Sequence, residues 1–170
     1  MSKRWLMGIL VIAGVASMVW WLRWDRDLWL INRRSEQLAR TLHKTANEGL
    51  LSLAQRVTEI AGFFSHSPLI VTGEPLPAIS SYEELRATIS TSMQVNKELK
   101  TLLLEHEAIW AQPHQKAIMH VVVEVAVDTP DEHETLRRAY DLDWIREDSR
   151  WVIARAQWRE NHRETAASGQ

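Results

Sequence analysis

The hydrophobic and polar positions divide the chain into an apolar start and a longer amphipathic part. Residues 5–22 form eighteen consecutive positions without a charged side chain. As a helix they would extend over roughly 27 Å, close to the hydrocarbon thickness of a bilayer. We therefore predict a transmembrane anchor at residues 5–22. The alternative is a cleaved secretory signal with its cleavage site near Ala16, but the apolar stretch continues beyond that site to Leu22.

Tryptophan side chains cluster around this stretch, where an indole ring can rest at the level of the lipid headgroups. The predicted membrane belt consists of Trp5, Trp20, Trp21, Trp24 and Trp29. Lys3 and Arg4 precede the stretch and favour a cytoplasmic N-terminus, whereas several arginines follow it and favour the reverse. A short basic head is typical of an uncleaved signal anchor. We expect a single-pass protein whose soluble domain lies outside the cytoplasm, on the periplasmic side if the source is bacterial.

A helical pattern follows the apolar stretch. From Leu28 to Phe64 apolar residues recur every three or four positions, with a shift of phase near Gly49. This predicts one long helix or two nearly continuous ones, the first a stalk leaving the membrane and the second packed on the domain.

Turn-forming residues then interrupt the helical pattern. Prolines and a glycine in residues 65–81 leave room for one short strand, Leu69 to Thr72. Ser81 followed by Glu84 is a capping box, and the apolar stripe behind it predicts a helix of about fourteen residues.

The remainder of the chain alternates between apolar and polar residues, or is continuously apolar, in four stretches joined by short turns. The stretches are Leu102 to Gln112, Lys116 to Asp128, Glu134 to Arg146 and Arg150 to Arg159. Because the links are short, we expect an antiparallel meander. The predicted fold class is α+β, with helices packed on a curved four-stranded antiparallel sheet.

This order of elements resembles the nuclear transport factor two-like fold, also known as the SnoaL-like or cystatin-like cone. Three local motifs carry the resemblance: Phe63-Phe64 before Pro68-Leu69-Ile70-Val71, Tyr82-Glu83-Glu84-Leu85, and Asp148-Ser149-Arg150-Trp151-Val152-Ile153. In the last motif Ser149 replaces the usual glycine. The resemblance implies a sheet wrapped around a helix. It implies no particular activity, because the family contains isomerases, dehydratases, epoxide hydrolases and domains without activity.

The predicted organisation has five parts. They are a basic head at residues 1–4, the anchor at 5–22, an interfacial or stalk segment at 23–37, the nuclear transport factor two-like domain at 38–160, and a disordered tail at 161–170.

Strand periodicity predicts which side chains face the interior, since neighbours along a strand point to opposite faces. Met119, Val121, Val123, Val125 and Val127 form an apolar face that must belong to the core. By the same parity the other core positions are Leu102, Leu104, His106, Ala108, Trp110, Leu136, Tyr140, Leu142, Trp144, Val152, Ala154, Ala156 and Trp158. A bulge in an edge strand would instead bury Trp151 with Ile153 and turn Arg155 and Gln157 inward.

This parity gives the cone a candidate pocket formed by His106, Tyr140, Trp110, Trp144 and Trp158. The pocket could bind a small ligand, or use the histidine and tyrosine as acid and base. The alternative is a histidine and a tyrosine that are hydrogen-bonded among core tryptophans and serve the structure alone. The strand carboxylates all fall on the other face, whereas isomerases of this fold place a carboxylate and a phenol inside the cone. We therefore predict no catalytic residues.

The reverse face of the sheet collects charges of both signs. The candidate interface consists of Glu105, Glu107, His120, Glu124, Arg137, Asp141, Asp143, Arg155 and Arg159. Acids and bases could match across a two-fold axis, so we expect a protein partner or a homodimer.

Composition and motif content narrow the classes of ligand and cofactor that the protein could bind. A net charge of −2 provides no basic field for nucleic acid. The chain has no cysteine, and its seven histidines show no metal-binding spacing. Phosphate-binding and dinucleotide-binding glycine motifs are also missing from the sequence, so we expect neither metal nor cofactor.

These observations favour a membrane-tethered, non-catalytic interaction or scaffold domain in a membrane-associated assembly. A small-ligand-binding domain is the first alternative. An isomerase-like or hydrolase-like enzyme that uses the cone pocket is the second.

Overall fold

A computed structural model of the chain describes residues 26–45, 48–71, 78–96, 98–128 and 133–159. The predicted anchor, the predicted tail and the belt positions Trp5, Trp20, Trp21 and Trp24 lie outside these residues. None of the helices formed by the described residues is long and apolar enough to cross a membrane.

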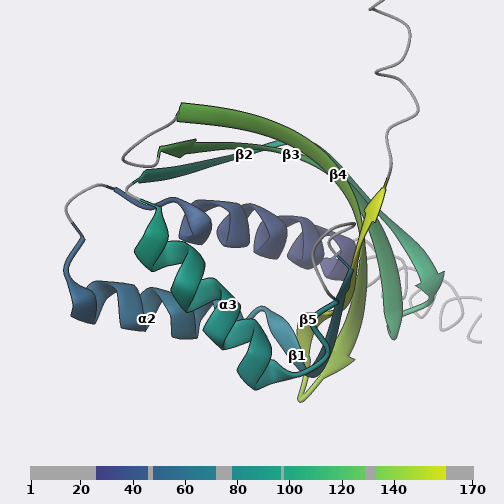
Figure 1. The fold of residues 1–170 in the computed structure, drawn as a ribbon. Helices are drawn as coiled ribbons and strands as arrows, with labels where there is room; N and C mark the ends of the chain where they lie inside the picture. Colours follow the sequence, from purple (N-terminus) through teal and green to yellow (C-terminus); the bar gives the residue numbers. More distant parts are fainter. Residues whose placement is uncertain (1–25, 46–47, 72–77, 97, 129–132, 160–170) are drawn as a thin grey trace, which may run out of the picture.

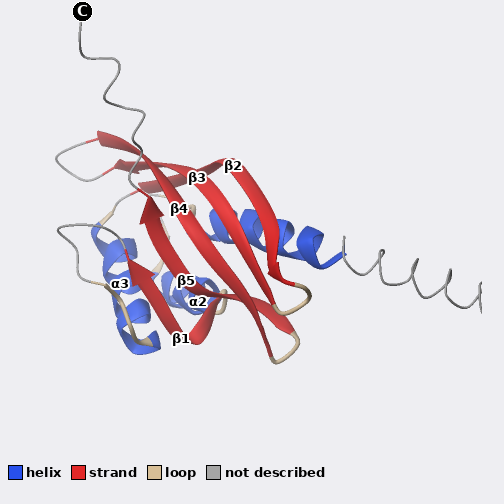
Figure 2. Cartoon of the chain, turned by 90° about the vertical axis from the view of Figure 1, so that its right-hand side faces the viewer, coloured by secondary structure: helices blue, strands red, loops and turns tan. Residues whose placement is uncertain are grey.

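The described residues form three helices and a five-stranded sheet (Figures 1 and 2). A helix at residues 26–42, called here the N-terminal helix, comes first. The elements that follow are α2 (Leu50–Ala61), β1 (Phe64–Val71), α3 (Tyr82–Val95), β2 (Glu98–Gln112), β3 (Lys116–Asp128), β4 (His133–Glu147) and β5 (Arg150–Arg159).

The sheet has the strand order β1-β5-β4-β3-β2. Strands β2 to β5 form the expected antiparallel meander. The prediction of a four-stranded antiparallel sheet is nevertheless wrong, because β1 adds a fifth strand that pairs in parallel with β5. The short strand expected at Leu69 to Thr72 is longer than predicted and begins at Phe64. The parallel pairing depends on the long connection from β1 to β5, which local sequence patterns do not reveal.

The sheet curves around the N-terminal helix, and α2 and α3 lie on the other side of that helix (Figure 1). Ile31 of the helix is fully buried in the core cluster beside Met119 and Trp144. The Ser35 hydroxyl is also buried, where it bonds to the Ile31 carbonyl and lies 3.0 Å from the Met119 sulfur. The predicted stalk at residues 23–37 is thus, from residue 26 onward, part of the domain, and the domain begins earlier than residue 38.

The two helical segments predicted between Leu28 and Phe64 are separate helices, and the described residues of the link between them, 43–45 and 48–49, are not helical. Lys44 in this link forms an isolated bridge with Leu99, and its ammonium donates to the carbonyls of Met93 and Asn96. The link therefore attaches the end of the N-terminal helix to the start of β2 and the end of α3. The expected shift of phase corresponds to this link and to Gly49, which stands at the N-cap position of α2.

The capping box is confirmed at α3. The Ser81 hydroxyl accepts a hydrogen bond from the Glu84 backbone at 3.1 Å, and the Glu84 carboxylate accepts one from the Ser80 backbone at 3.1 Å. The first contact satisfies an amide that the first helical turn leaves unpaired, and the second ties the residue before the N-cap to the helix.

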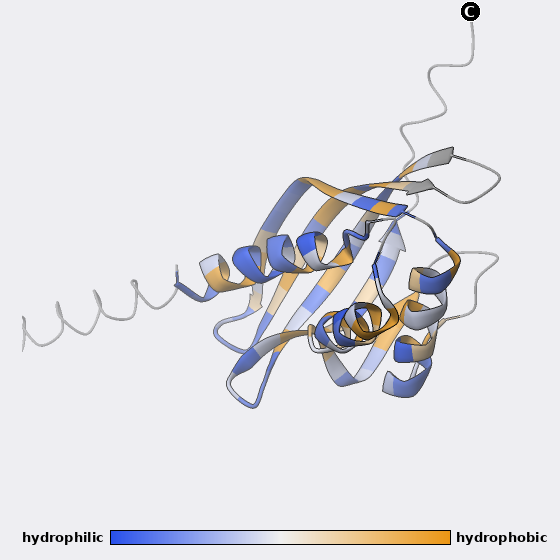
Figure 3. Cartoon of the chain, turned by 90° about the vertical axis from the view of Figure 1, so that its left-hand side faces the viewer, coloured by the Kyte–Doolittle hydropathy of each residue, from blue (hydrophilic) through white to orange (hydrophobic). Residues whose placement is uncertain are grey.

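Apolar and polar positions alternate along the strands, as the hydropathy colouring of Figure 3 shows. Met119 and Val121 of β3 are buried as predicted, and Val123 and Val125 are half-buried. In β2 the register shifts between Leu103 and Glu105. The shift makes Leu103 the residue packed against the core, while Leu102 and Leu104 are 58% and 42% exposed. The prediction of Leu102 and Leu104 as core is therefore wrong.

A second irregularity occurs where β4 pairs with β5, next to Trp144. It buries Trp151 and Ile153 in the core cluster in place of the predicted Val152 and Ala154. Val152 is buried as well, although it pairs with Ile145 on the reverse side of the strand. The alternative of a bulge in β5 is thus confirmed for this buried pair.

The same alternative is wrong for the end of the strand, where Arg155 and Gln157 remain exposed. The shift lies between Ile153 and Arg155, so the residues after it face the sides of the sheet that the strand periodicity predicted.

Candidate functional site

Three of the five predicted pocket residues lie in one row across the inner face of the sheet. His106 pairs with Val121, Val121 with Tyr140, and Tyr140 with Trp158. The His106 side chain is 30% exposed, and Tyr140 and Trp158 are half-buried. This row, called here the inner row, places an imidazole, a phenol and an indole side by side on the concave face.

The other two predicted pocket residues belong to a separate group. Trp110 and Trp144 both pair with Ala117, four residues along β3 from Val121. At about 3.3 Å per residue the two groups are roughly 13 Å apart. Trp144 is fully buried, and Trp110 packs on Trp151 with a ring distance of 5.6 Å. The structure therefore divides the predicted pocket into an accessible inner row and a packed tryptophan core.

Sequence reasoning missed one carboxylate on the concave face. Glu36 of the N-terminal helix places Oε1 at 3.8 Å from His106 Nε2, while its Oε2 accepts a hydrogen bond from Arg40 at 3.1 Å. The expectation that the cone contains no carboxylate considered the strands only. The apolar stripe of the helix could have revealed this carboxylate. The stripe places Ser35 on the side of the helix that faces the sheet, and Glu36 is the next residue.

Tyr140 has an altered acidity. Burial raises the pKa of its phenol, and the positive charge of the nearby Arg138 partly opposes this shift. The phenol therefore stays neutral and able to donate a hydrogen bond over a wider pH range than an exposed tyrosine. Together the inner row and Glu36 offer a donor, an imidazole and a carboxylate, which is a set that can bind or protonate a polar small molecule.

A second polar cluster lies where the N-terminal helix begins. Asp27, whose side chain is 13% exposed, lies 2.9 Å from His114 Nδ1 and accepts a hydrogen bond from Trp151 Nε1 at 3.5 Å. Arg146 approaches the same carboxylate at 3.9 Å. His114 has a positive φ of 56° in the β2–β3 turn, and its ring packs on Trp110 at 5.3 Å. Asp27 thus links the start of the helix to both hairpins of the sheet.

Two arginines of the N-terminal helix have different roles. Arg34 donates to the Gly62 carbonyl at 3.4 Å and lies over the Phe63 ring at 5.0 Å. Burial and the charge of Arg150 lower its pKa. Arg33 instead lies over the ring of Trp29 at 5.1 Å, and Trp29 is 54% exposed. Trp29 is the one predicted belt residue within the described part of the chain.

The predicted charged face is present on the convex side of the sheet, and several of its charges pair within the chain. His120 Nδ1 lies 2.5 Å from Asp141, which Arg159 approaches at 3.5 Å. Asp143 binds Lys116 at 2.8 Å, a partner that the prediction omitted. Glu105 lies 3.6 Å from Arg137, and Arg155 donates to Gln157 at 2.7 Å.

Large apolar side chains are also exposed along β2, next to these ion pairs. Leu102, Leu104 and Ile109 are 58%, 42% and 46% exposed. Ile109 pairs with Ile118, and Leu102 with Glu124, so both lie on the convex face. We call this combined surface, with the ion pairs above, the outer face.

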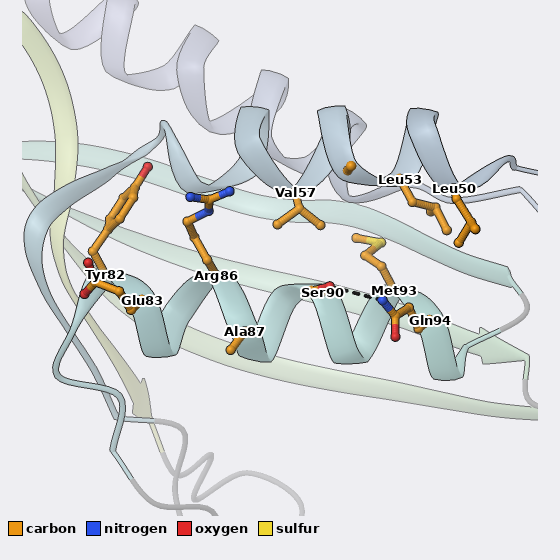
Figure 4. A pocket seen from close by; sticks show the side chains of 11 residues that line it. Leu50, Leu53, Val57, Tyr82, Glu83, Arg86, Ala87, Ser90, Met93 and Gln94 are labelled. Carbon is orange, nitrogen blue, oxygen red and sulfur yellow. Dashed lines mark hydrogen bonds between the residues drawn. The ribbon is translucent and has the colours of Figure 1, made fainter.

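A groove of about 380 Å³ separates α2 from α3. Leu53, Val57 and Met93 line it with apolar atoms, and the side chains of Ser90 and Gln94 are hydrogen-bonded at its edge (Figure 4). None of the predicted site residues borders this groove. Elsewhere among the described residues, no group of three histidines or carboxylates converges as a metal site would require.

Sequence comparison gives no match, neither to a protein-family model nor to a curated protein. Comparison of the fold with solved structures does give matches. The chain is similar to a protein from Novosphingobium aromaticivorans proposed to be a scytalone dehydratase, with a TM-score of 0.65, 12% identity and coverage of 78% of this chain and 83% of that one. A proposed aromatic ring hydroxylase from the same organism has a TM-score of 0.65 and 12% identity over 79% and 88% of the two chains.

A third neighbour names the fold family. It is a proposed dehydratase of the NTF2-like family from Streptomyces avermitilis, with a TM-score of 0.60 and 9% identity over 79% of this chain and 95% of that one. These likenesses show that the domain has the nuclear transport factor two-like fold. At such low identity they show the fold alone.

Proposed function

We propose that the protein is a membrane-tethered interaction domain that associates with a second copy of itself through the outer face. The single observation that carries this proposal is the exposure of Leu102, Leu104 and Ile109 beside ion pairs that are already formed within the chain. Large apolar side chains on a sheet face are typical of surfaces that bind other proteins.

The paired charges make burial of this face feasible. A carboxylate that enters an interface without a partner carries a large desolvation cost. On the outer face Asp141 and Asp143 already contact His120, Arg159 and Lys116. For these two carboxylates an acid-to-base match across the two-fold axis is therefore not required, and apolar contact supplies the attraction.

The tether is the anchor at residues 5–22, whose support remains the uncharged stretch of the sequence. With the basic head on the cytoplasmic side, the domain lies outside the cytoplasm. Tethering confines the copies to one surface, which raises their effective concentration and permits a weak interface to function.

The test replaces Leu102 and Ile109 with lysine in the full chain. Self-association in detergent, measured by light scattering, should weaken by about tenfold or more because two apolar contacts are lost. The matched control is the lysine substitution of Leu50 and Leu51, which are 80% and 88% exposed on α2. Equal association of both double variants, or a wild-type chain that remains a monomer at all concentrations, would contradict the proposal.

A small-ligand site on the concave face is the second candidate, favoured by the 3.8 Å approach of Glu36 to His106. The structural neighbours include proposed dehydratases and a proposed aromatic ring hydroxylase, and for this chain we propose a small ring compound as ligand. Glu36 and His106 would exchange a proton, and the Tyr140 phenol would donate to a ligand oxygen.

For this candidate we would screen small aromatic and alicyclic hydroxy and keto compounds for a shift in melting temperature of the full chain. A compound that stabilises the wild type should lose its effect in Glu36→Gln and Tyr140→Phe. It should keep that effect in Glu107→Gln, because the Glu107 carboxylate lies on the convex side of β2, the strand that carries His106. A shift that persists in all three variants would place the ligand elsewhere, and a screen without any shift would leave the candidate unsupported.

A further inference from the structure

One end of the domain is formed jointly by the first turns of the N-terminal helix, the β2–β3 turn and the β4–β5 turn (Figure 2). We call it the entry end. Asp27 holds it together through His114 of the first turn, Arg146 of β4 and Trp151 of β5. Because Asp27 is 13% exposed and contacts three side chains, the helix meets the sheet in a fixed position. The entry end is therefore one built surface.

The exposed charges of the entry end are mainly positive. Among its described residues the exposed arginines are Arg26, Arg33, Arg146 and Arg150, and the exposed acid is Asp148. Glu147 is half-buried, and the Asp27 carboxylate is shielded by Arg146 and His114. Anionic phosphate groups are the chemical partners that such a surface attracts.

An aromatic side chain completes this surface. Trp29 is 54% exposed, and the guanidinium of Arg33 lies 5.1 Å from its ring. Indole rings with a free edge and neighbouring arginines are typical of the lipid interface, where the ring displaces water and the cation meets phosphate.

The sequence fixes how far the entry end can be from the anchor. Residues 23–25 separate Leu22, the last residue of the uncharged stretch, from the helical Arg26. Four residue steps reach at most about 14 Å when fully extended. Other surfaces of the domain are attached only through the entry end, so this end is the part nearest the bilayer.

We propose that the entry end docks on the phospholipid headgroups, with Trp29 in the interfacial layer and Arg26 and Arg33 on lipid phosphates. The inference rests on the tether of the proposed function. It adds a fixed orientation, in which the β3–β4 end points away from the membrane. The strands of the outer face are then steeply inclined to the bilayer plane, so that neighbouring copies can meet side by side.

The absence of cysteine permits a direct measurement. Two single-cysteine variants each introduce one exposed site for a nitroxide label. Gln115→Cys lies in the β2–β3 turn at the entry end, and Thr135→Cys lies near the start of β4, at the other end of the domain. The full chain is reconstituted into vesicles of phosphatidylcholine and phosphatidylglycerol that contain a lipid with a nickel-chelating headgroup. We expect the nickel to enhance the relaxation of the label at position 115 several-fold more than at position 135.

The contribution of the named side chains is tested in the same vesicles. Trp29→Ser combined with Arg33→Glu should lower the enhancement at position 115. Arg40→Glu should not, because Arg40 is exposed on the same helix but about 10 Å further along it.

The possible results separate the orientation from the tether. Equal enhancement at positions 115 and 135 in vesicle-bound protein overturns the docked orientation and leaves the tether in place. An unchanged signal in the Trp29 and Arg33 variant overturns their contact with headgroups. Recovery of the protein outside the vesicle fraction overturns the tether, and this inference with it.

Discussion

The two tyrosines of the chain occupy different surroundings, and Tyr140 is the one in the inner row. Burial disfavours its phenolate, so the phenol contributes full stability below its unfolded pKa and that stability is lost as the pH rises through the raised folded pKa. Alkaline solution should therefore destabilise the domain partly through this single residue.

The corresponding experiment uses Tyr82→Phe, which leaves Tyr140 as the only phenol. Ultraviolet titration of phenolate absorbance should give a midpoint above the ordinary value of 10.0 in the folded protein, and a return to that value in denaturant. A midpoint at or below the ordinary value in the folded state would mean that Tyr140 is solvated.

At the scale of elements, the bulge in β2 determines which leucine supports the core. Leu103→Asp would place a carboxylate against the apolar cluster and should lower the free energy of unfolding by about 3 kcal/mol or more. Leu102→Asp, on the exposed side of the same strand, should change it by less than about 1 kcal/mol. Denaturant unfolding of the two variants gives the comparison. The opposite ranking would mean that the register shift between Leu103 and Glu105 is absent.

At the scale of the whole molecule, the proposed anchor would decide where every other surface acts. Arginine at both Leu10 and Val11 places two charges near the bilayer centre, at several kcal/mol on insertion scales. The variant should leave the membrane pellet after an alkaline wash. Arginine at both Leu50 and Leu51 is the matched control and should stay in the pellet, since these leucines are exposed on α2. Retention of the Leu10 and Val11 variant would contradict the anchor.

Local sequence patterns were sufficient for most elements of this domain. The capping box located the start of α3, and the turns located the meander β2 to β5 close to its observed bounds. The apolar face of β3 and the inward position of His106, Tyr140 and Trp158 also followed from parity. These features depend on neighbours within a few residues, which is the range over which hydrophobic periodicity and hydrogen-bonded caps act.

Only the tertiary structure decided the rest. The parallel contact of β1 with β5, the insertion of Ile31 into the core and the approach of Glu36 to His106 each join segments far apart in the chain. The register shifts after Leu103 in β2 and after Ile153 in β5 were equally hidden, because an extra residue in a strand leaves alternation intact on either side of it. Which leucines of β2 are buried, and which carboxylate faces the inner row, therefore depended on packing between elements rather than on the pattern within any one of them.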